Sequence, residues 1–210
     1  MLTAAAALPL VGTTGLIVKH GAGAFNDMPV PNLGVLPSNS EILDRNGSLL
    51  AIYVPGYPNP KYRVPVAYDQ IAPVMRDAII AIEDARFRQH GAFDFRGFLR
   101  ALLTTVSGSG TQGGSTLAQQ YVKNALVLTA SNHTQAQEAI AVNLLRKLRE
   151  LRIAARVEHA MTKDQLLAAY LNATYYPNNS WGIQNAAESY FSVTAADLTL
   201  PEAALLAGMV

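Results

Sequence analysis

The sequence has 210 residues, of which 50% are hydrophobic and 15% are charged, and its 16 basic residues nearly balance its 15 acidic ones. A chain of this length usually forms one domain, so these residues leave no room for two full catalytic domains. The apolar content excludes a disordered chain, and the near-neutral charge excludes a global basic field for non-specific nucleic-acid binding. The sequence contains no cysteine, which excludes disulfides, thiolate catalysis and cysteine-ligated zinc.

The first 24 residues are predicted to be a membrane anchor. Residues Met1–Val18 carry no charge, and a stretch of 18 residues is near the lower limit for a membrane-spanning helix. A secretory signal that ends at the small residues 22–24 is the second interpretation, and a buried core helix is the third. The first two interpretations place the rest of the chain outside the cytoplasm. We therefore expect a single-pass protein of the cell membrane with its folded part on the extracytoplasmic face.

Residues 25–70 are predicted to form a tether and a hairpin. Several prolines between residues 25 and 40 indicate an extended segment. Within residues 41–53, two apolar runs flank Asn46-Gly47, which is the strongest short signal for a β-hairpin. We expect this region to separate the anchor from a main domain at residues 71–210.

The main domain is predicted to contain only helices. Pro73 suits a helix start, and residues 74–87 follow without glycine or another proline. Glu83 shares one face of this helix with Ile79 and Phe87, because offsets of three and four residues fall on the same side. A carboxylate in that position faces inward.

Further helices follow from periodicity and capping motifs. They are expected at residues 95–106, before a glycine-rich loop at 107–114, from residue 115 or 116 to 128, at 134–161, and after the capping motifs Thr162–Gln165 and Thr199–Glu202. The apolar segment 95–106 suits contact with a bilayer surface and core packing equally well. The last helix is expected to be still running at Val210, which predicts that the chain is a fragment.

Two charged residues interrupt an apolar stripe of the predicted helix 134–161. Arg146 and Glu150 belong to a series of otherwise apolar residues that are spaced three or four positions apart. Both charges therefore lie on a side of the helix that is otherwise buried. Buried charges are costly unless they are paired or used. An Arg–Glu pair that satisfies itself is one interpretation, and an anion site that includes the neighbouring Lys147 is the other.

Four motifs in fixed order resemble those of one enzyme family. The run from Glu83 to Gly91 is similar to the signature EDxxFxxHxG, with its glycine one place early. The second motif, GST[IL]TQQxxKN, is similar to Gly114–Asn124. The third, RKxxE, is similar to Arg146–Glu150, and the fourth, YLN, to Tyr170–Asn172. Together they resemble the family-51 peptidoglycan glycosyltransferases, the polymerase domains of class A penicillin-binding proteins and their monofunctional relatives. The closing run Gly182–Gly208 also resembles the family's pattern, so the resemblance covers nearly the whole chain.

A few positions depart from that pattern. Ala118 stands where the second motif usually has threonine, and Ala168 stands where a glutamate commonly precedes the fourth motif. The glycines that the pattern has near Pro177 and Ser192 are absent. The two alanines remove polar side chains without touching an expected catalytic group, whereas the missing glycines affect the geometry of loops.

The resemblance implies a mainly α, lysozyme-like fold with two helical lobes and a substrate cleft between them. It also implies glycan-chain polymerisation. The growing glycan is transferred from its undecaprenyl pyrophosphate to the 4-hydroxyl of the N-acetylglucosamine of lipid II, with inversion at the anomeric carbon. Such a reaction needs a base for the hydroxyl proton, cations for the leaving pyrophosphate and a groove that faces lipid.

The resemblance assigns these tasks to particular residues. Glu83 is the expected base, and Glu150 is the second essential carboxylate, which orients the cations or assists the acceptor. Residues 115–120 lie at a predicted helix start, where backbone N–H groups favour an anion. Lys123, Arg146 and Lys147 are the candidates to compensate the pyrophosphate charge. The full set of expected substrate-binding residues is Asp84, Ser115, Thr116, Gln119, Gln120, Lys123, Asn124, Arg146 and Lys147.

The other motif residues are expected to be structural. They are Phe87, His90, Gly91, Tyr170 and Asn172, with His90 holding the turn at Gly91. The sequence requires no cofactor, although a Mg or Mn ion that bridges the pyrophosphate and Asp84 or Glu150 is compatible with the chemistry. The implied partners are lipid II, nascent glycan strands, the membrane, and proteins of cell-wall synthesis and division, with no nucleic acid.

Two other functions stay open from the sequence. A lysozyme-like or lytic enzyme that cleaves glycans also uses an acidic residue on a helical fold. The predicted cation cluster argues against it, because a hydrolase has no pyrophosphate leaving group. An inactive, truncated membrane scaffold is the third candidate.

Overall fold

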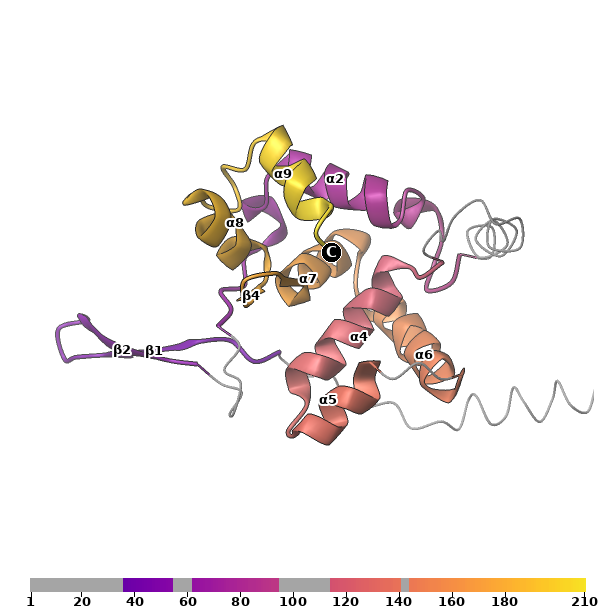
Figure 1. Ribbon diagram of the computed structural model, residues 1–210, viewed down its shortest axis with the longest axis horizontal. Helices are drawn as coiled ribbons and strands as arrows, with labels where there is room; N and C mark the ends of the chain where they lie inside the picture. The colour runs from indigo at the N-terminus through magenta and orange to yellow at the C-terminus, as the bar shows by residue number, and fades with distance from the viewer. Residues whose placement is uncertain (1–35, 55–61, 95–113, 141–143) are drawn as a thin grey trace, which may run out of the picture.

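The computed structural model describes residues 36–54, 62–94, 114–140 and 144–210, and this part of the chain is mainly helical (Figure 1). Its elements in chain order are β1 (Ser40–Leu43), β2 (Leu49–Tyr53), the 3-10 helix η1 (Tyr68–Gln70), α2 (Pro73–Glu83), the 3-10 helix η2 (Phe87–Gln89), α4 (Leu117–Thr129), α5 (His133–Ile140), α6 (Leu144–Ala160), α7 (Lys163–Ala173), β3 (Tyr175–Tyr176), β4 (Ser180–Trp181), α8 (Ile183–Phe191) and α9 (Leu200–Ala207). The predicted mainly α class is confirmed.

Four sequence predictions lie wholly or mostly outside the described residues. They are the anchor or signal at residues 1–24, the extended tether as far as residue 35, the helix at 95–106, and the glycine-rich loop as far as residue 113. Among the helices that the structure does describe, none has the length and apolar character needed to cross a bilayer.

Helix α7 lies in the middle of the helical elements (Figure 1), where it contacts α4, α6, α8 and η1. Its side chains Leu166, Leu167 and Leu171 are fully buried. As predicted, Thr162 and Gln165 form a capping box at its start: Gln165 N donates to Thr162 Oγ1 at 3.2 Å, and Thr162 N donates to Gln165 Oε1 at 2.9 Å. Burial of apolar side chains is the main favourable contribution to folding, so α7 provides a shared packing surface for α4, α6 and α8.

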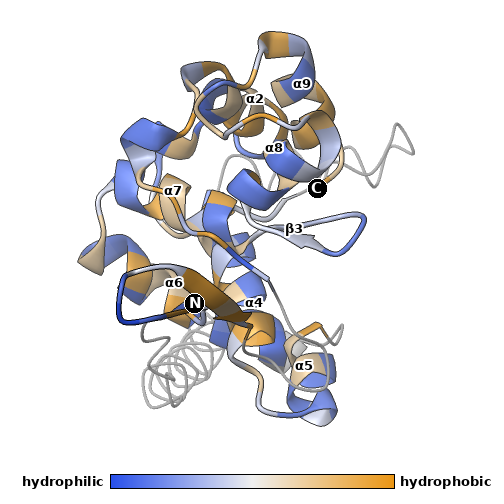
Figure 2. Ribbon diagram, turned by 90° about the vertical axis from the view of Figure 1, so that its left-hand side faces the viewer, coloured by the Kyte–Doolittle hydropathy of each residue, from blue (hydrophilic) through white to orange (hydrophobic). Residues whose placement is uncertain are grey.

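Helix α4 begins at the cap residue Thr116, as predicted, and contacts α5, α6 and α7. Figure 2 shows polar and apolar residues mixed along α4, α5 and α6, which is typical of helices with one buried face. Within the single helix predicted for residues 134–161, the structure describes two helical stretches, α5 and α6, and both contact α4. The continuity of the predicted helix across residues 141–143 lies outside the described part.

Helix α2 runs beside α9 (Figure 1) and ends earlier than predicted. Its last residue is Glu83, and Phe87 lies in the separate turn η2, so the predicted helical face shared by Glu83 and Phe87 is wrong. The helix ends where the backbone of Asp84 leaves the helical conformation, with φ −156° and ψ 71°, and the Asp84 side chain bonds to other elements, as described below. Helix α9 ends at Ala207, with Gly208 as its C-terminal cap, so the prediction that this helix still runs at Val210 is also wrong.

The predicted hairpin is present as the antiparallel strands β1 and β2, which project away from the helices (Figure 1). Asn46 and Gly47 lie in its turn, and Gly47 has a φ of 84°. The side chain of Asp44 organises the turn, since its Oδ1 accepts the N–H groups of Asn46 at 2.7 Å and Ser48 at 2.8 Å. The loop is therefore longer than the two-residue turn for which an Asn-Gly pair is best known.

A second hairpin, β3–β4, lies where the sequence predicts only helices. Tyr175 pairs with Trp181, and their ring centroids are 5.1 Å apart. In the turn, Asn178 and Asn179 have φ angles of 64° and 57°. Asparagine tolerates this left-handed backbone better than most residues, so the turn forms without a glycine. Strands of two residues are too short to produce a periodic signal.

Arg63 and Asn172 tie the segment before α2 to the end of α7. Asn172 Nδ2 donates to Val66 O at 2.7 Å, and its Oδ1 accepts from Val66 N at 3.0 Å. The buried Arg63 guanidinium donates to three backbone carbonyl groups, including that of Asn172 at 3.3 Å. Burial lowers the pKa of Arg63. Gly182 fits against this pair with a φ of 84°, and a Cβ there would lie 3.0 Å from Asn172 O.

We expect Gly182→Ala to destabilise the fold. The new methyl would meet the carbonyl oxygen of Asn172, and alanine strongly disfavours a positive φ, so the free energy of unfolding should fall by about 2 kcal/mol or more. Thermal or urea unfolding measures this. Gly91→Ala is the matched control, because a Cβ at Gly91 meets no atom within 4 Å; equal stability of the two variants would contradict the prediction.

We expect Ser192→Gly to stabilise the fold. Ser192 is the C-terminal cap of α8 and has left-handed angles, φ 59° and ψ 33°. Glycine adopts this conformation without the penalty of a side chain, so the free energy of unfolding should rise by about 0.5–1 kcal/mol. Ser189→Gly, inside α8, should change stability in the opposite direction. A lower melting temperature for Ser192→Gly would show that the cap carries no strain.

Candidate active site

The start of helix α4 is held by a carboxylate from the end of α2. Asp84 Oδ2 accepts the backbone N–H of Leu117, the first residue of α4, at 3.2 Å. Thr116 caps the same helix, since its Oγ1 accepts from Gln119 N at 3.3 Å. A carboxylate at a helix N-terminus is stabilised by the free N–H groups and by the helix dipole. Asp84 therefore already occupies an N–H group at the helix start where a substrate phosphate was expected.

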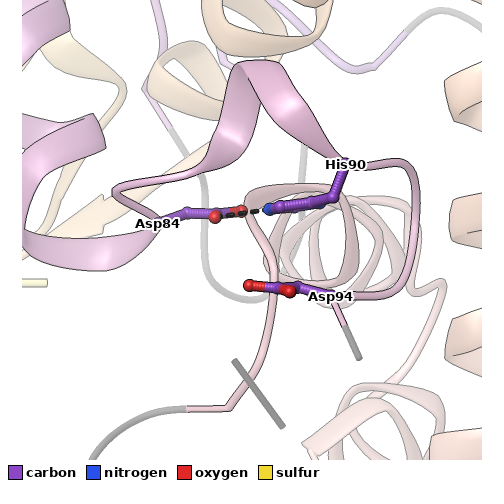
Figure 3. Close-up of side chains that lie close together, drawn as sticks. All are labelled: Asp84, His90 and Asp94. Atoms are coloured by element: carbon purple, nitrogen blue, oxygen red, sulfur yellow. Dashed lines mark hydrogen bonds and ion pairs between the residues drawn. The ribbon is translucent and has the colours of Figure 1, made fainter. Parts of the chain in front are cut away.

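His90 connects Asp84 to the turn that follows η2 (Figure 3). Its Nε2 lies 2.6 Å from Asp84 Oδ1, and its Nδ1 lies 2.6 Å from Gly91 O. Lys163 closes the same turn from the start of α7. Its Nζ donates to His90 O at 2.6 Å and lies 4.5 Å from the centre of the buried Phe87 ring. These contacts give the first motif a fixed shape between α2, α4 and α7.

Asp84, His90 and Asp94 form a compact group whose ligand atoms lie within 4.8 Å of one another (Figure 3). Each of these atoms already has a partner. Asp94 holds the guanidinium of Arg86, with NH2 2.5 Å from both carboxylate oxygens, and both oxygens of Asp84 are used as described above. Mg²⁺ and Mn²⁺ prefer open oxygen ligands with several waters. In this arrangement the group does not fit such an ion, and a Mg or Mn ion, which the sequence allows but does not require, stays untested.

Glu83 lies at the end of α2 and contacts α4. Gln120 Nε2 donates to Glu83 Oε2 at 2.7 Å. The hydroxyl of Tyr170, on α7, donates to Gln120 Oε1 at 3.4 Å. Burial raises the pKa of Tyr170 above its ordinary value of 10.0, and the charge of Glu83 adds to that shift. Tyr170 is therefore a neutral donor, and the three side chains form a chain from α7 through α4 to α2.

Glu150, on α6, is enclosed by cations. Lys147 Nζ lies 2.6 Å from Glu150 Oε1, and Arg146 bonds to Glu150 Oε2. The Glu150 side chain is 4% exposed, whereas those of Arg146 and Lys147 are 20% and 35% exposed. Lys147 Nζ also donates to Ser115 Oγ at 2.9 Å. The buried charge is thus paired, and its cations reach the surface beside the start of α4.

Three acidic side chains of the motifs therefore meet one short segment, residues 115–120. Asp84 bonds to Leu117, Glu83 bonds to Gln120, and Glu150 reaches Ser115 through Lys147. These contacts link the first three motifs, and Tyr170 adds the fourth. The convergence of Glu83 and Glu150 on one region of the fold, which the sequence alone only implies through the family resemblance, is present in the structure.

The remaining predicted binding residues divide into two groups. Lys123 and Asn124 lie one turn beyond Gln120 on the same side of α4 and are half-buried. Within the described residues, Lys123 has no hydrogen bond or ion pair. Thr116 and Gln119, in contrast, are buried, and both donate to Ala92 O, at 3.1 and 2.9 Å. Their contacts are those of structural residues, so substrate binding by Thr116 and Gln119 stays a prediction.

Sequence reasoning missed two residues that hold the site together. Lys163 bonds to the first motif, as described above, and also to Glu158 at 2.9 Å. Arg86 bonds to Asp94. No spacing signal marks either of them, because their partners lie in other elements. The only hint for Lys163 is its place directly after the capping residue Thr162.

Comparison of the sequence with known proteins points to one family. The profile of the transglycosylase family matches residues 49–210. Penicillin-binding protein 1A of Mycobacterium tuberculosis is 39% identical over 189 residues, which are 89% of this chain and 22% of that protein. Penicillin-binding protein 1A of Escherichia coli is 37% identical over 170 residues, 80% of this chain and 18% of that protein. Penicillin-binding protein 1F of Bacillus subtilis is 36% identical over 177 residues, 83% of this chain and 22% of that protein.

The chain thus spans about a fifth of the length of these relatives. The match to the profile covers well over half of the chain and includes every motif that meets at the start of α4. The chain therefore belongs to the family of transglycosylase domains found in class A penicillin-binding proteins.

Proposed function

We propose that this chain carries the site of peptidoglycan glycan-chain polymerisation. The growing glycan passes from its lipid-linked pyrophosphate to the 4-hydroxyl of the N-acetylglucosamine of lipid II, with inversion at the anomeric carbon. The observation that supports this most directly is the meeting of Glu83 with Gln120 and of the Glu150 cation cluster with Ser115 at one end of α4. A proton acceptor and a cation cluster for a leaving diphosphate are two of the requirements of the reaction.

Glu83 is the base in this proposal. An alcohol is a poor nucleophile at neutral pH, so a carboxylate must accept its proton as the new glycosidic bond forms. Glu83 is half-buried, and its contact among the described residues is the single amide of Gln120 on Oε2. Both oxygens of Glu150, in contrast, are bonded to cations. Of the two carboxylates, Glu83 is the one with an oxygen available for the acceptor hydroxyl.

The cations of α6 stabilise the leaving pyrophosphate. Glu150 fixes Arg146 and Lys147 by accepting from both, and this leaves their outer sides partly exposed. Fixed cations in a site with little water stabilise developing negative charge better than mobile ones do. Lys123, on the same side of α4 as Gln120, is the third cation of this group. Glu150 acts in this scheme by holding the cations, not by accepting a proton.

The wider setting is part of the same proposal. The catalytic part lies on the extracytoplasmic face of the cell membrane, anchored by residues 1–24, and has a lysozyme-like arrangement of two helical lobes. Its partners are lipid II, the nascent glycan strand, and proteins of cell-wall synthesis and division. The membrane suits this role because both the donor and the acceptor carry lipid chains.

Replacing the base should abolish most of the activity. Glu83→Gln keeps the size of the side chain but cannot accept the hydroxyl proton, so kcat should fall about 10²- to 10⁴-fold. The measurement is polymer formation from purified lipid II by the chain in detergent. Glu138→Gln, the same change on an exposed residue of α5, should leave the rate unchanged. Polymer formation at the wild-type rate by Glu83→Gln would refute the assignment, and release of fragments from finished peptidoglycan would favour a lytic enzyme.

Removing one cation should weaken both the site and the fold. Lys147→Met keeps the length of the side chain but leaves Ser115 without its donor and Glu150 with one cation. Because Lys147 is about a third exposed, the free energy of unfolding should fall by only about 1 kcal/mol. The value of kcat/KM should fall at least about tenfold, because developing charge on the pyrophosphate is less well compensated. Arg149→Met, on the exposed side of α6, is the matched control. Equal polymerisation rates for the two variants would contradict the role of Lys147.

A further inference from the structure

Gln120 occupies a different place from the one that its motif suggests. The sequence predicts that it binds donor phosphate or sugar. Its amide instead lies between two side chains of the protein, with Nε2 2.7 Å from Glu83 Oε2 and Oε1 3.4 Å from the hydroxyl of Tyr170. Both ends of the amide are therefore engaged before any substrate is present.

The contact with Glu83 fixes which way the amide points. A carboxylate only accepts, so it must face the NH₂ group of Gln120. Tyr170 is 1% exposed; its hydroxyl can donate or accept, and it donates to the amide oxygen that this orientation turns toward it. A flipped amide would place Oε1 against the carboxylate of Glu83, with two acceptors facing each other. One orientation satisfies both neighbours.

We propose that Gln120 is the positioning residue of Glu83: it binds carboxylate oxygen Oε2 and thereby presents Oε1 to the acceptor hydroxyl, while Tyr170 holds Gln120 from behind. This inference rests on the proposed function, since it assumes that Glu83 is the base. Glu83 Oε1 has no hydrogen bond among the described residues. A glutamate at the end of a helix has three rotatable side-chain bonds, so a single strong contact decides where its free oxygen points.

The energetic consequence falls on the chemical step. Hydrogen bonds to an ionised group are about twice as strong as neutral ones and restrict its geometry more. Proton transfer needs the base within about 3 Å of the hydroxyl, so loss of orientation lowers the rate of reaction and leaves substrate affinity largely unchanged. A residue that binds substrate gives the opposite pattern, with a raised KM.

Steady-state kinetics with lipid II separates these two roles. Gln120→Met keeps the length of the side chain and removes both contacts. We expect it to lower kcat about tenfold or more while KM changes less than about twofold. Tyr170→Phe, which removes only the hydroxyl, should lower kcat about two- to fivefold, again with little effect on KM. Gln137→Met, the same change on an exposed position of α5, should match the wild type, and thermal unfolding checks that every variant is folded.

A double-mutant cycle gives the decisive result. In a Glu83→Gln background no base remains to be positioned, so adding Gln120→Met should change the residual rate less than about twofold and leave the Kd for lipid II unchanged. A rise in KM or Kd, or the same fold-loss in both backgrounds, would show that Gln120 contacts substrate and would overturn the inference. A wild-type rate for Glu83→Gln alone would instead refute the proposed function, so the two failures are distinguishable.

Discussion

The contact between the carboxylate of Asp84 and the first N–H of helix α4 is the constraint on which the rest of the site depends. Asp84 lies at the end of α2, where its backbone leaves the helical conformation, and its side chain fills a free donor at the start of α4, so one residue connects the two helix ends. His90 shares that carboxylate and fixes the turn between the two helices. As a result, Glu83, the last residue of α2, can only lie beside the first turns of α4. The position of the proposed base is thus set by its neighbour in the sequence.

The two glutamates of the motifs differ in their surroundings, and this difference determines what each can do. Glu150 is enclosed, with a cation on each oxygen, so its charge is compensated and its oxygens are unavailable to a substrate proton. Among the described residues, Glu83 has one neutral amide as its partner, on Oε2, and none on Oε1. A buried carboxylate between two cations organises them, whereas a partly buried carboxylate with a free oxygen can exchange a proton with a ligand. The family resemblance assigns Glu83 as the base and leaves open whether Glu150 orients the cations or assists the acceptor; the contacts of Glu150 favour the first of these two roles.

Local signals predicted the start of most helices well. The caps at Thr116, Thr162 and Thr199 are present, as is the Asn-Gly hairpin, because capping and turn formation depend on a few neighbouring residues. Helix ends and lengths were predicted less well. Asp84, where α2 ends, bonds to residues of other elements, and periodicity within a segment cannot report such contacts. The strands of the β3–β4 hairpin are too short to give a periodic signal.

Prediction from the sequence has the same limit for the motif residues of the site. Their identity and order in the sequence indicate which side chains gather, but not which of them face one another and which face the substrate. Thr116 and Gln119, in the middle of the second motif, are buried and bonded to Ala92, whereas Gln120, the next residue, turns toward Glu83. Adjacent residues on a helix point about 100° apart, so one motif necessarily supplies both the packing of α4 and the surface of the site. A motif of this kind determines both how its helix packs against the neighbouring elements and which side chains remain uncovered. The uncovered side chains are the ones that can act at the site.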